Sequence, residues 1–439
     1  MNISGPSTVS DSTSPKNSGL KQPLVPAGRL LPFILVTALF FLWGIPNNLN
    51  DILIRQFMKS FEINRLQAGL VQSAFYMGYF LLAIPAGQLM RRAGYKAGII
   101  TGLILYGIGC FLFWPAAIVG QYWFFLTALF VIASGLAFLE TAASPFIVQL
   151  GDPESSEGRL NFSQAFNPLG SISAVLIGSQ FIFSGIELKP AQITAMQTAH
   201  TYQAYLRSET LRVIIPYVVI GVIVFVWAIL IARTRFPHTG LDYSRATLDR
   251  DHSRPVWKRR HFVWSVFAQF VYVGAQVGVW SYLISYVQTY AGLPERTASL
   301  WLTAGLAALA AGRFAASGLM RIIPAHQLLG LFAVVNTILA AVAAFHPGWL
   351  GVWSLLLMSF CMSMMFPTIF ALGVKGLGTR TKTGGSILVM SIIGGAAIPP
   401  IMGKLPDIAQ SYLVPGVCFA CVAVYAFLFS QPKPIDVDA

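Results

Sequence analysis

Long apolar segments constrain this chain more than any other feature of its sequence. Hydrophobic residues make up 56% of the 439 residues and charged residues only 10%, whereas soluble domains are about a quarter charged. A helix that crosses a membrane needs about 20 largely apolar residues. The chain is therefore expected to be an all-α membrane protein with twelve transmembrane helices. The twelve segments are 31–53, 68–90, 97–117, 121–149, 162–184, 212–233, 261–290, 297–319, 327–345, 348–374, 384–404 and 411–430.

A charged stretch divides these segments into two sets of six. Leu89-Met90-Arg91 at the end of the second segment matches Leu319-Met320-Arg321 at the end of the eighth, as a six-helix duplication requires. Two parallel halves with a site between them are the architecture of many secondary transporters. We expect a disordered tail at 1–27, a first half at 28–233, a linker at 234–260, a second half at 261–431 and a short tail at 432–439.

The distribution of positive charge predicts the orientation of the chain. The formal net charge is +13, and most Lys and Arg fall in segments that would share one side of the membrane with the N-terminus. Loops rich in Lys and Arg face the cytoplasm. Met1–Ala27 is polar and has no apolar core that would make it a cleaved signal peptide. We expect a multi-pass protein of the inner (plasma) membrane with both termini cytoplasmic, and no nucleic-acid partner.

Two carboxylic acids fall where a membrane protein tolerates charge least. Asp51 closes the run Asn47-Asn48-Leu49-Asn50-Asp51, and Glu140 is the only ionisable residue in Val131–Leu150. Such acids usually face a cavity, a partner or a proton path, and a low dielectric favours their neutral, protonated form. We expect Asp51 and Glu140 to be an outer and an inner proton station. The alternative is that Asp51 caps a helix at the interface and Glu140 is a hydrogen-bonded structural acid.

Neutral polar residues repeat along several of the apolar segments. Asn161, Gln164 and Asn167 recur every three residues, which places them near one helix face. Amides offer both donors and acceptors, which suits a substrate with neighbouring hydroxyl groups, although polar side chains also bond helices together. The candidate substrate-binding residues are Asn47, Asn48, Gln72, Tyr76, Gln164, Asn167, Tyr272 and Gln276.

The inventory of charges and motifs excludes several classes of function. The sequence has no GxxxxGK[ST] nucleotide-binding motif, so transport must use a gradient. No Lys or Arg is expected near the middle of the membrane, since Arg313 is assigned to the inner gate or loop network, and carriers of anions generally need such a cation. We expect no metal and no cofactor, with the proton as the coupling ion. A proton-dependent drug exporter, a sugar sensor and a membrane enzyme are the weaker alternatives.

Several motifs resemble those of one transporter family. The run Gly87–Lys96 is similar to the loop signature of the major facilitator superfamily, with Arg91 where an Asp is usual. The chain resembles the fucose–galactose–glucose:proton symporter branch of that superfamily through further blocks. These are Asn47–Asp51, Gln72–Tyr76, Tyr95–Gly102, Glu140–Ala143, Arg159–Asn161, Gly274–Gln276 and Pro367–Phe370.

The resemblance implies a specific activity. It implies alternating-access import of a neutral monosaccharide with protons, L-fucose first and galactose or glucose as the alternative, by a monomer in the lipid bilayer. It also assigns proton coupling to Asp51 and Glu140, and places Gln164 and Asn167 in the cavity. Met365-Phe366 stands where the branch commonly has Gln-Tyr, a change that could alter which sugar is preferred.

Overall fold

The computed structural model describes residues 27–63, 67, 70–182, 184, 186, 188, 190–236 and 256–431. The side chains of a few residues inside these ranges, Asp51 among them, lie outside the description. The expected tails and most of the expected linker at 234–260 also lie outside it. The described residues form helices and no β-strand.

The first half contains eight α-helices and three short helical turns among its described residues. They are η1 (Ala27–Arg29), α1 (Leu30–Ser60), α3 (Leu70–Val119), α4 (Tyr122–Gln149), η2 (Pro153–Ser155), α5 (Ser156–Gln164), α6 (Asn167–Ile177), the π-helical η3 (Gly178–Ile182), α7 (Pro190–Thr198), α8 (Tyr202–Leu211) and α9 (Ile214–Arg233).

The second half begins at η5 and ends at the π-helical η8. Its elements are η5 (Val256–Lys258), α10 (Arg260–Ala291), α11 (Glu295–Leu319), α12 (Ala325–Phe345), α13 (Trp349–Met362), α14 (Met365–Val374), η6 (Gly378–Arg380), α15 (Thr381–Met390), η7 (Ser391–Ile393), α16 (Gly394–Gly403), α17 (Ile408–Ser411), α18 (Leu413–Val424) and η8 (Tyr425–Phe429).

The helices agree with the twelve segments expected from the sequence. Ten helical stretches in the described residues are long and apolar enough to cross a membrane. One of them, α3, contains the second and third segments, joined at Gly94 with φ 83° and ψ 173°. The fifth segment is divided among α5, α6 and η3, and no one of these is long enough alone. The expected all-α, twelve-helix architecture is confirmed.

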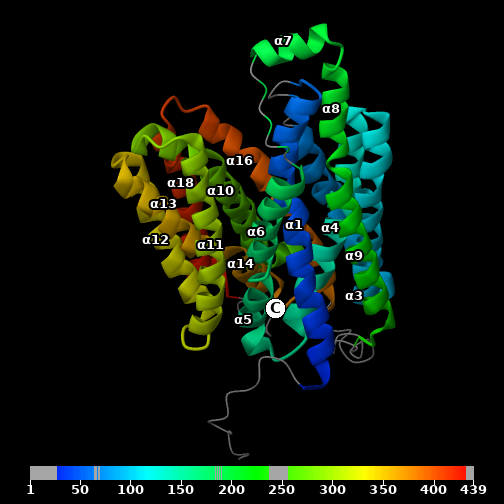
Figure 1. Ribbon diagram of the computed structural model, residues 1–439. Coiled ribbons are helices and arrows are strands. Elements are labelled where there is room, and N and C mark those ends of the chain that lie inside the picture. The colour runs from blue at the N-terminus through cyan, green and yellow to red at the C-terminus, as the bar shows by residue number, and fades with distance from the viewer. Residues whose placement is uncertain are drawn as a thin grey trace, which may run out of the picture.

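The two halves meet at one end of the molecule and splay apart towards the other (Figure 1). Helix α5 of the first half contacts α11 and α14 of the second, and α3 and α4 contact α15. We call this contact region the junction. The described ends of the chain lie at the same end. Arg29 Nη1 donates to the carbonyl of Leu150 at 3.0 Å, and Gln431 Nε2 lies 2.8 Å from Nδ1 of His326, which is near the Lys375–Glu157 pair.

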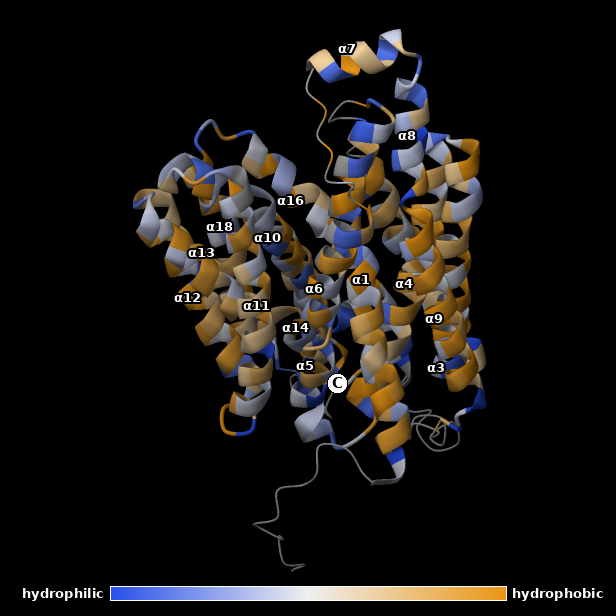
Figure 2. Cartoon of the chain, viewed as in Figure 1, coloured by the Kyte–Doolittle hydropathy of each residue, from blue (hydrophilic) through white to orange (hydrophobic). Residues whose placement is uncertain are grey.

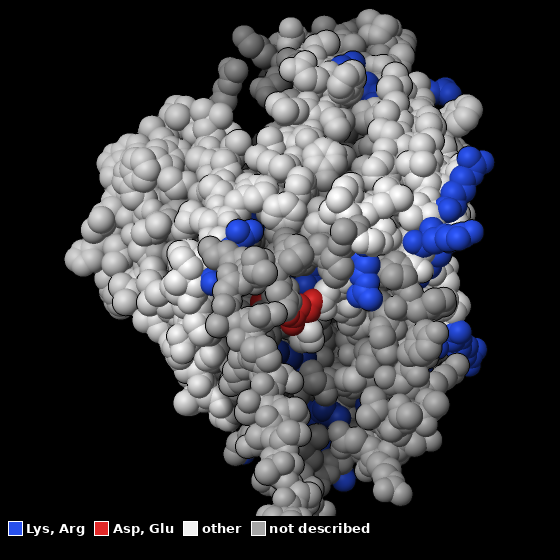
Figure 3. Space-filling model, turned by 90° about the horizontal axis from the view of Figure 1, so that it is seen from below, with Lys and Arg blue, Asp and Glu red and all other residues white. Residues whose placement is uncertain are grey.

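The outer surface of the bundle suits lipid. Large apolar side chains are exposed along α9 and α18, among them Ile215, Val226 and Val417, and Figure 2 shows hydrophobic residues over the flanks of the helices. Exposed Arg91 and Arg92 lie at the junction end of the first half. The view of this end in Figure 3 shows Lys and Arg side chains around the face and acidic side chains near its middle.

Glycine allows α1 and α6 to cross closely. A Cβ atom built on Gly44 would lie 2.3 Å from the carbonyl oxygen of Asn167, and one on Gly170 would lie 2.1 Å from that of Phe41. No side chain fits at either position, so the two helices touch backbone to backbone. The break before α6 follows from Pro168, because proline disfavours helical backbone in the preceding residue and donates no backbone hydrogen bond.

Candidate functional site

Glu140 lies on α4, facing the second half. Every residue of α4 from Ser134 to Ile147 is buried, and the Glu140 side chain is only 8% exposed. It is within electrostatic reach of Arg313 on α11 and of Tyr79 on α3. Among the described residues no ion pair joins Glu140 to Arg313. The carboxyl group is therefore buried in the charge field of a cation without being bound to it.

Tyrosines of α3 surround the acid on the side of the first half. Tyr79 is buried and lies beside Glu140 and Asn47. Tyr76, one turn away, is half-buried, and its hydroxyl reaches the second half, 2.9 Å from where a Cβ atom of Gly395 would be. Asn47 is also half-buried, and its side-chain oxygen has no partner in the described part of the chain. Together these residues form a polar wall next to Glu140.

Asn48 and Asn167 bind neighbouring helices. Asn48 Nδ2 donates to Ser171 Oγ at 2.6 Å and to the Gly44 carbonyl at 3.2 Å. Asn167 Nδ2 donates to the carbonyl of Phe40 at 3.2 Å. In this conformation both amides bond α1 to α6. Polar residues commonly have this structural role in helical bundles. Their predicted role in sugar binding stays a prediction.

Asp51 and Gln72 lie on the same two helices as Asn47 and Tyr76. Asp51 is inside α1, which continues to Ser60, so the residue is not at a helix end; its side chain lies outside the description. Gln72 of α3 is half-buried, one turn from Tyr76. The pairing of Asp51 and Glu140 as proton stations remains a proposal.

Gln164 occupies the last position of α5, at the junction. Its carbonyl oxygen accepts a hydrogen bond from Arg313 Nη1, while its own side-chain Nε2 is buried without a partner in the described part of the chain. The helix break after Gln164 means that it does not share one continuous helix with Asn167. A buried amide donor without a partner is costly, and it is available to a hydroxyl that enters the site.

Of the two candidate residues on α10, one is completely buried and the other is partly accessible. Tyr272 is completely buried, and its hydroxyl donates to the carbonyl of Met362 at 2.9 Å. Gln276, one turn further along, is half-buried and makes no hydrogen bond within the described residues. Trp280 Nε1 donates to Ser359 Oγ at 3.2 Å. Gln276 is therefore the better candidate for contact with a substrate in this conformation.

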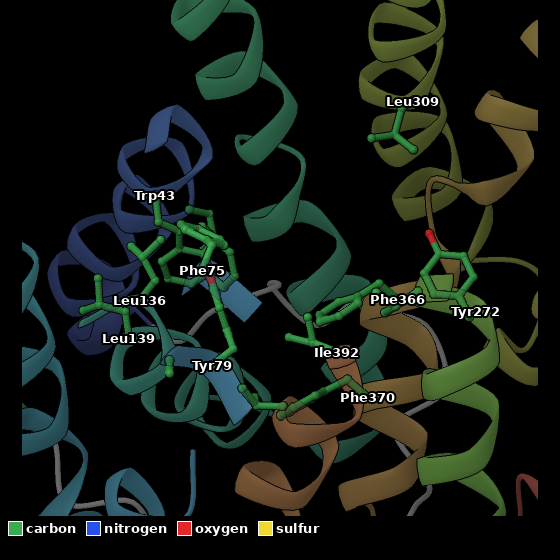
Figure 4. Close-up of a cluster of buried hydrophobic side chains, with 14 of the residues drawn as sticks. Trp43, Phe75, Tyr79, Leu136, Leu139, Tyr272, Leu309, Phe366, Phe370 and Ile392 are labelled. Carbon is green, nitrogen blue, oxygen red and sulfur yellow. The ribbon is translucent and has the colours of Figure 1, made fainter. Parts of the chain in front are cut away.

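Buried side chains of the two halves, most of them apolar, lie on opposite sides of the site. Figure 4 shows Phe366, Phe370 and Ile392 on one side, opposite Phe75 and Tyr79 on the other. All five are buried. Apolar side chains close to a buried acid and amides suit a sugar, because a sugar ring has hydroxyl groups at its edge and an apolar face.

Direct bonds between the halves close the junction. Asn161 Nδ2 donates to Thr368 Oγ1 at 3.0 Å, and Lys375 Nζ pairs with Glu157 Oε1 at 2.9 Å. A cavity of about 320 Å³ lies beside them, lined by residues of both halves including Gln149 and Lys375. These contacts join the halves at the junction, so separating them would open the path to that end.

Two residues that the sequence analysis did not place in the site belong to it. Tyr79 is three residues after Tyr76 and shares its helix face, a spacing that could have identified it. Arg313 was expected in the gate network, and it does lie at the junction, where Nε donates to the carbonyl of Ser363 and Nη1 to that of Gln164; its charge also acts on Glu140. That interaction depends on how the two halves are placed relative to each other, which spacing along one chain does not reveal.

Two six-helix halves that meet at a junction, with an acid and amides buried between them, are the architecture of a secondary transporter. The family model described as Major Facilitator Superfamily matches residues 32–399. The chain belongs to this family.

Comparison with individual proteins confirms the resemblance to the fucose–galactose–glucose branch. The L-fucose-proton symporter of Escherichia coli is 43% identical over 411 residues, covering 92% of this chain and 94% of that protein. A glucose/galactose transporter of Brucella abortus is 38% identical, covering 90% and 93%. The crystal structure of the transporter FucP in the outward conformation matches with a TM-score of 0.82 and 42% identity, covering 92% of this chain and 99% of that one.

Proposed function

We propose that this protein imports a neutral monosaccharide together with protons by alternating access, and that L-fucose is its substrate. The similarity to the L-fucose-proton symporter over nearly the whole chain supports this sugar. The single observation that carries the mechanism is Glu140, a buried carboxyl group that faces the space between the halves and has no ion-pair partner among the described residues.

The second candidate substrate is galactose or glucose. The 38% identity to a glucose/galactose transporter supports it, and so does Phe366, which presents no hydroxyl to the site. A lost hydrogen bond to a sugar hydroxyl changes discrimination by a few kcal/mol.

We also propose the membrane, the orientation and the oligomeric state of the carrier. Exposed Arg91, Arg92 and Arg321 lie near the junction, because Gly87 of α3 packs against Ser386 of α15 and Met320 lies beside Asn161 of α5. Their position supports a cytoplasmic location for that end and for both termini. We propose a monomer in the inner (plasma) membrane that needs no cofactor beyond the coupling proton. Asp51 is proposed as the outer proton station and Glu140 as the inner one.

Uptake into proteoliposomes tests the function. Labelled L-fucose, D-galactose and D-glucose are supplied with and without an inward proton gradient. We expect L-fucose to accumulate above equilibrium only with the gradient, and a protonophore to abolish the accumulation. Accumulation of galactose or glucose alone would select the second candidate. Flux of every sugar that ignores the gradient would contradict proton coupling.

A further inference from the structure

The cavity of about 320 Å³ at the junction has no role in the proposed transport cycle. The first half contributes the end of α4 and the start of α5 to its wall, with Gln149 and Ser156. The second half contributes the segment from the end of α14 to the start of α15, with Lys375 and Thr381. Because both halves supply the wall, the complete cavity requires a closed junction. Its volume is at the small end of the range for ligand pockets, which is about 300–1,000 Å³.

Gln149 contributes an amide group to this cavity. Its Oε1 and Nε2 atoms are both buried, and neither has a hydrogen-bond partner among the described residues. A buried polar group without a partner is unfavourable. A ligand with hydroxyl groups would satisfy both atoms, because a hydroxyl group donates and accepts.

The second half supplies positive charge and backbone donors. Lys375 Nζ donates to Glu157 Oε1 at 2.9 Å, and since an ammonium group has three protons it can also donate to a ligand. Helix α15 begins at Thr381, beside the cavity, with no acidic residue in its first turn and no side chain in the described part that caps it. The N-terminus of a helix attracts anions through its free N–H groups and its dipole.

The loop between α14 and α15 has a backbone shape that favours the same kind of ligand. Gly376 and Gly378, which line the cavity, have φ angles of 74° and 56°. Leu377 between them is right-handed, with φ −77° and ψ −12°. Alternating left-handed and right-handed residues direct successive N–H groups to one side, a geometry that binds anions.

The charged side chains around the cavity are mostly cations. Arg159 donates to the carbonyl of Val148 and Arg259 to that of Gly376, and both carbonyls belong to residues of the wall. Among the described side chains the cations are Lys375, Arg159, Arg259 and Arg380, and the acids are Asp152 and Glu157. Glu157 is already paired with Lys375, so an anion that enters meets a net positive charge.

We propose that this cavity binds a phosphorylated monosaccharide and that the bound ester inhibits the carrier. The phosphate group lies at Lys375 and the N-terminus of α15, and a sugar hydroxyl bonds to the amide of Gln149. A phosphate has several acceptor oxygens for the ammonium and N–H donors, and a free phosphate is smaller than the cavity. Phosphoryl transfer to an imported sugar would produce a ligand of this class.

Inhibition follows from the position of the cavity. A ligand that contacts both halves binds the closed junction and not the open one, so it shifts the population towards the closed state. The proposal rests on the proposed alternating access, and it does not depend on which sugar is transported or on the coupling proton.

Calorimetry on the full-length carrier in detergent tests binding directly. The probes are D-glucose 6-phosphate, inorganic phosphate and D-glucose. We expect one molecule of the ester per chain, inorganic phosphate to bind at least tenfold more weakly, and excess D-glucose not to displace the ester. Absence of ester binding would overturn the proposal. Tighter binding of inorganic phosphate would also overturn it, because the site would then belong to the free anion.

Variants of the wall locate the ester. Gln149→Leu and Lys375→Met should each weaken ester binding by about tenfold. Gln327→Leu makes the same chemical change at an exposed position at the start of α12, and should bind like the unaltered carrier. Gln149→Leu is decisive, because Lys375→Met also removes an ion pair of the junction. Normal ester affinity in a folded Gln149→Leu carrier would contradict the assigned site.

The distance between the halves tests the effect on conformation. Spin labels are attached to Ala93→Cys in the first half and Ile322→Cys in the second, both at exposed positions. Ester at 100 times its Kd should lower the ratio of open to closed carrier by about a hundredfold, and the same concentration should act about tenfold less on Gln149→Leu. An unchanged or longer distance with ester bound would overturn the inhibition. Neither measurement needs sugar uptake, so this proposal and the proposed function fail separately.

Discussion

Lys375 of α14 and Glu157 of α5 form an ion pair across the junction, with 2.9 Å between Nζ and Oε1. The side chain of Glu157 is 6% exposed and that of Lys375 is 37% exposed. Glu157 therefore depends on the opposite half for its compensating charge, while Lys375 remains in contact with solvent. The pair should favour the closed junction without fixing it.

Removal of this ion pair should shift the carrier towards the state open at the junction end. Partly exposed pairs contribute about 0.5–1 kcal/mol, so Lys375→Met should raise the open population about two- to fivefold. The distance between spin labels attached to Ala93→Cys in the first half and Ile322→Cys in the second, both at exposed positions, measures that population. The exchanged pair Glu157→Lys with Lys375→Glu should restore the original distribution, and an unchanged distribution in Lys375→Met would show that the pair contributes nothing.

Tyr272 should contribute to stability and not to sugar affinity. Tyr272→Phe removes a buried hydrogen bond to Met362, which should lower the free energy of unfolding by about 1 kcal/mol. Thermal unfolding in detergent and sugar binding by calorimetry check the two effects. Weaker sugar binding with unchanged stability would instead support the cavity role predicted from the sequence.

Gln276 should contribute to sugar affinity and not to stability. Loss of one hydrogen bond to a hydroxyl in a dry site costs about 1–2 kcal/mol, so Gln276→Ala should raise the Kd for the sugar about tenfold. Gln269 on the same helix is the matched control, since it is completely buried and both side-chain polar atoms lack a partner in the described part. Gln269→Leu should leave the Kd unchanged and stabilise the fold; the opposite pattern would exclude Gln276 from the site.

Gly394 should be required for packing between α16 and α10. A Cβ atom at this position would lie 2.0 Å from the carbonyl oxygen of Phe270, and such overpacking costs about 1–3 kcal/mol. Gly394→Ala should therefore lower the temperature of unfolding. Gly318→Ala in α11, where nothing lies within 4 Å, should not. Equal stability of the two variants would show that α16 shifts freely against α10, as a hinge would.

The fold could be predicted from sequence because each transmembrane helix carries its own signal. A run of about 20 apolar residues predicts a membrane-spanning helix by itself, and the prediction needs no information from the rest of the chain. The exceptions have local causes that hydropathy does not detect. The second and third segments merge through Gly94 into α3, and Pro168 breaks the fifth segment between Gln164 and Asn167.

The site could be predicted only in part, because its residues meet through tertiary packing. Glu140 was identifiable from the cost of an acid in an apolar helix. Asn48 and Asn167 have the same kind of amide group as Gln276. However, Asn48 of α1 bonds to α6 and Asn167 of α6 bonds to α1. Close contacts between helices, such as that of Gly44 with Asn167, decide which amides bond to a neighbouring helix and which remain available. The spacing of residues within one segment does not reveal these contacts.

The comparison of sugar exchange with gradient-driven uptake in Glu140→Gln tests the central claim most directly. Glutamine keeps the size and polarity of the side chain but cannot release a proton. We predict that the variant exchanges labelled for unlabelled L-fucose at a rate close to that of the unaltered carrier, and that an inward proton gradient no longer drives accumulation. Accumulation at the normal level in Glu140→Gln would contradict the account, because the coupling proton would then be carried elsewhere.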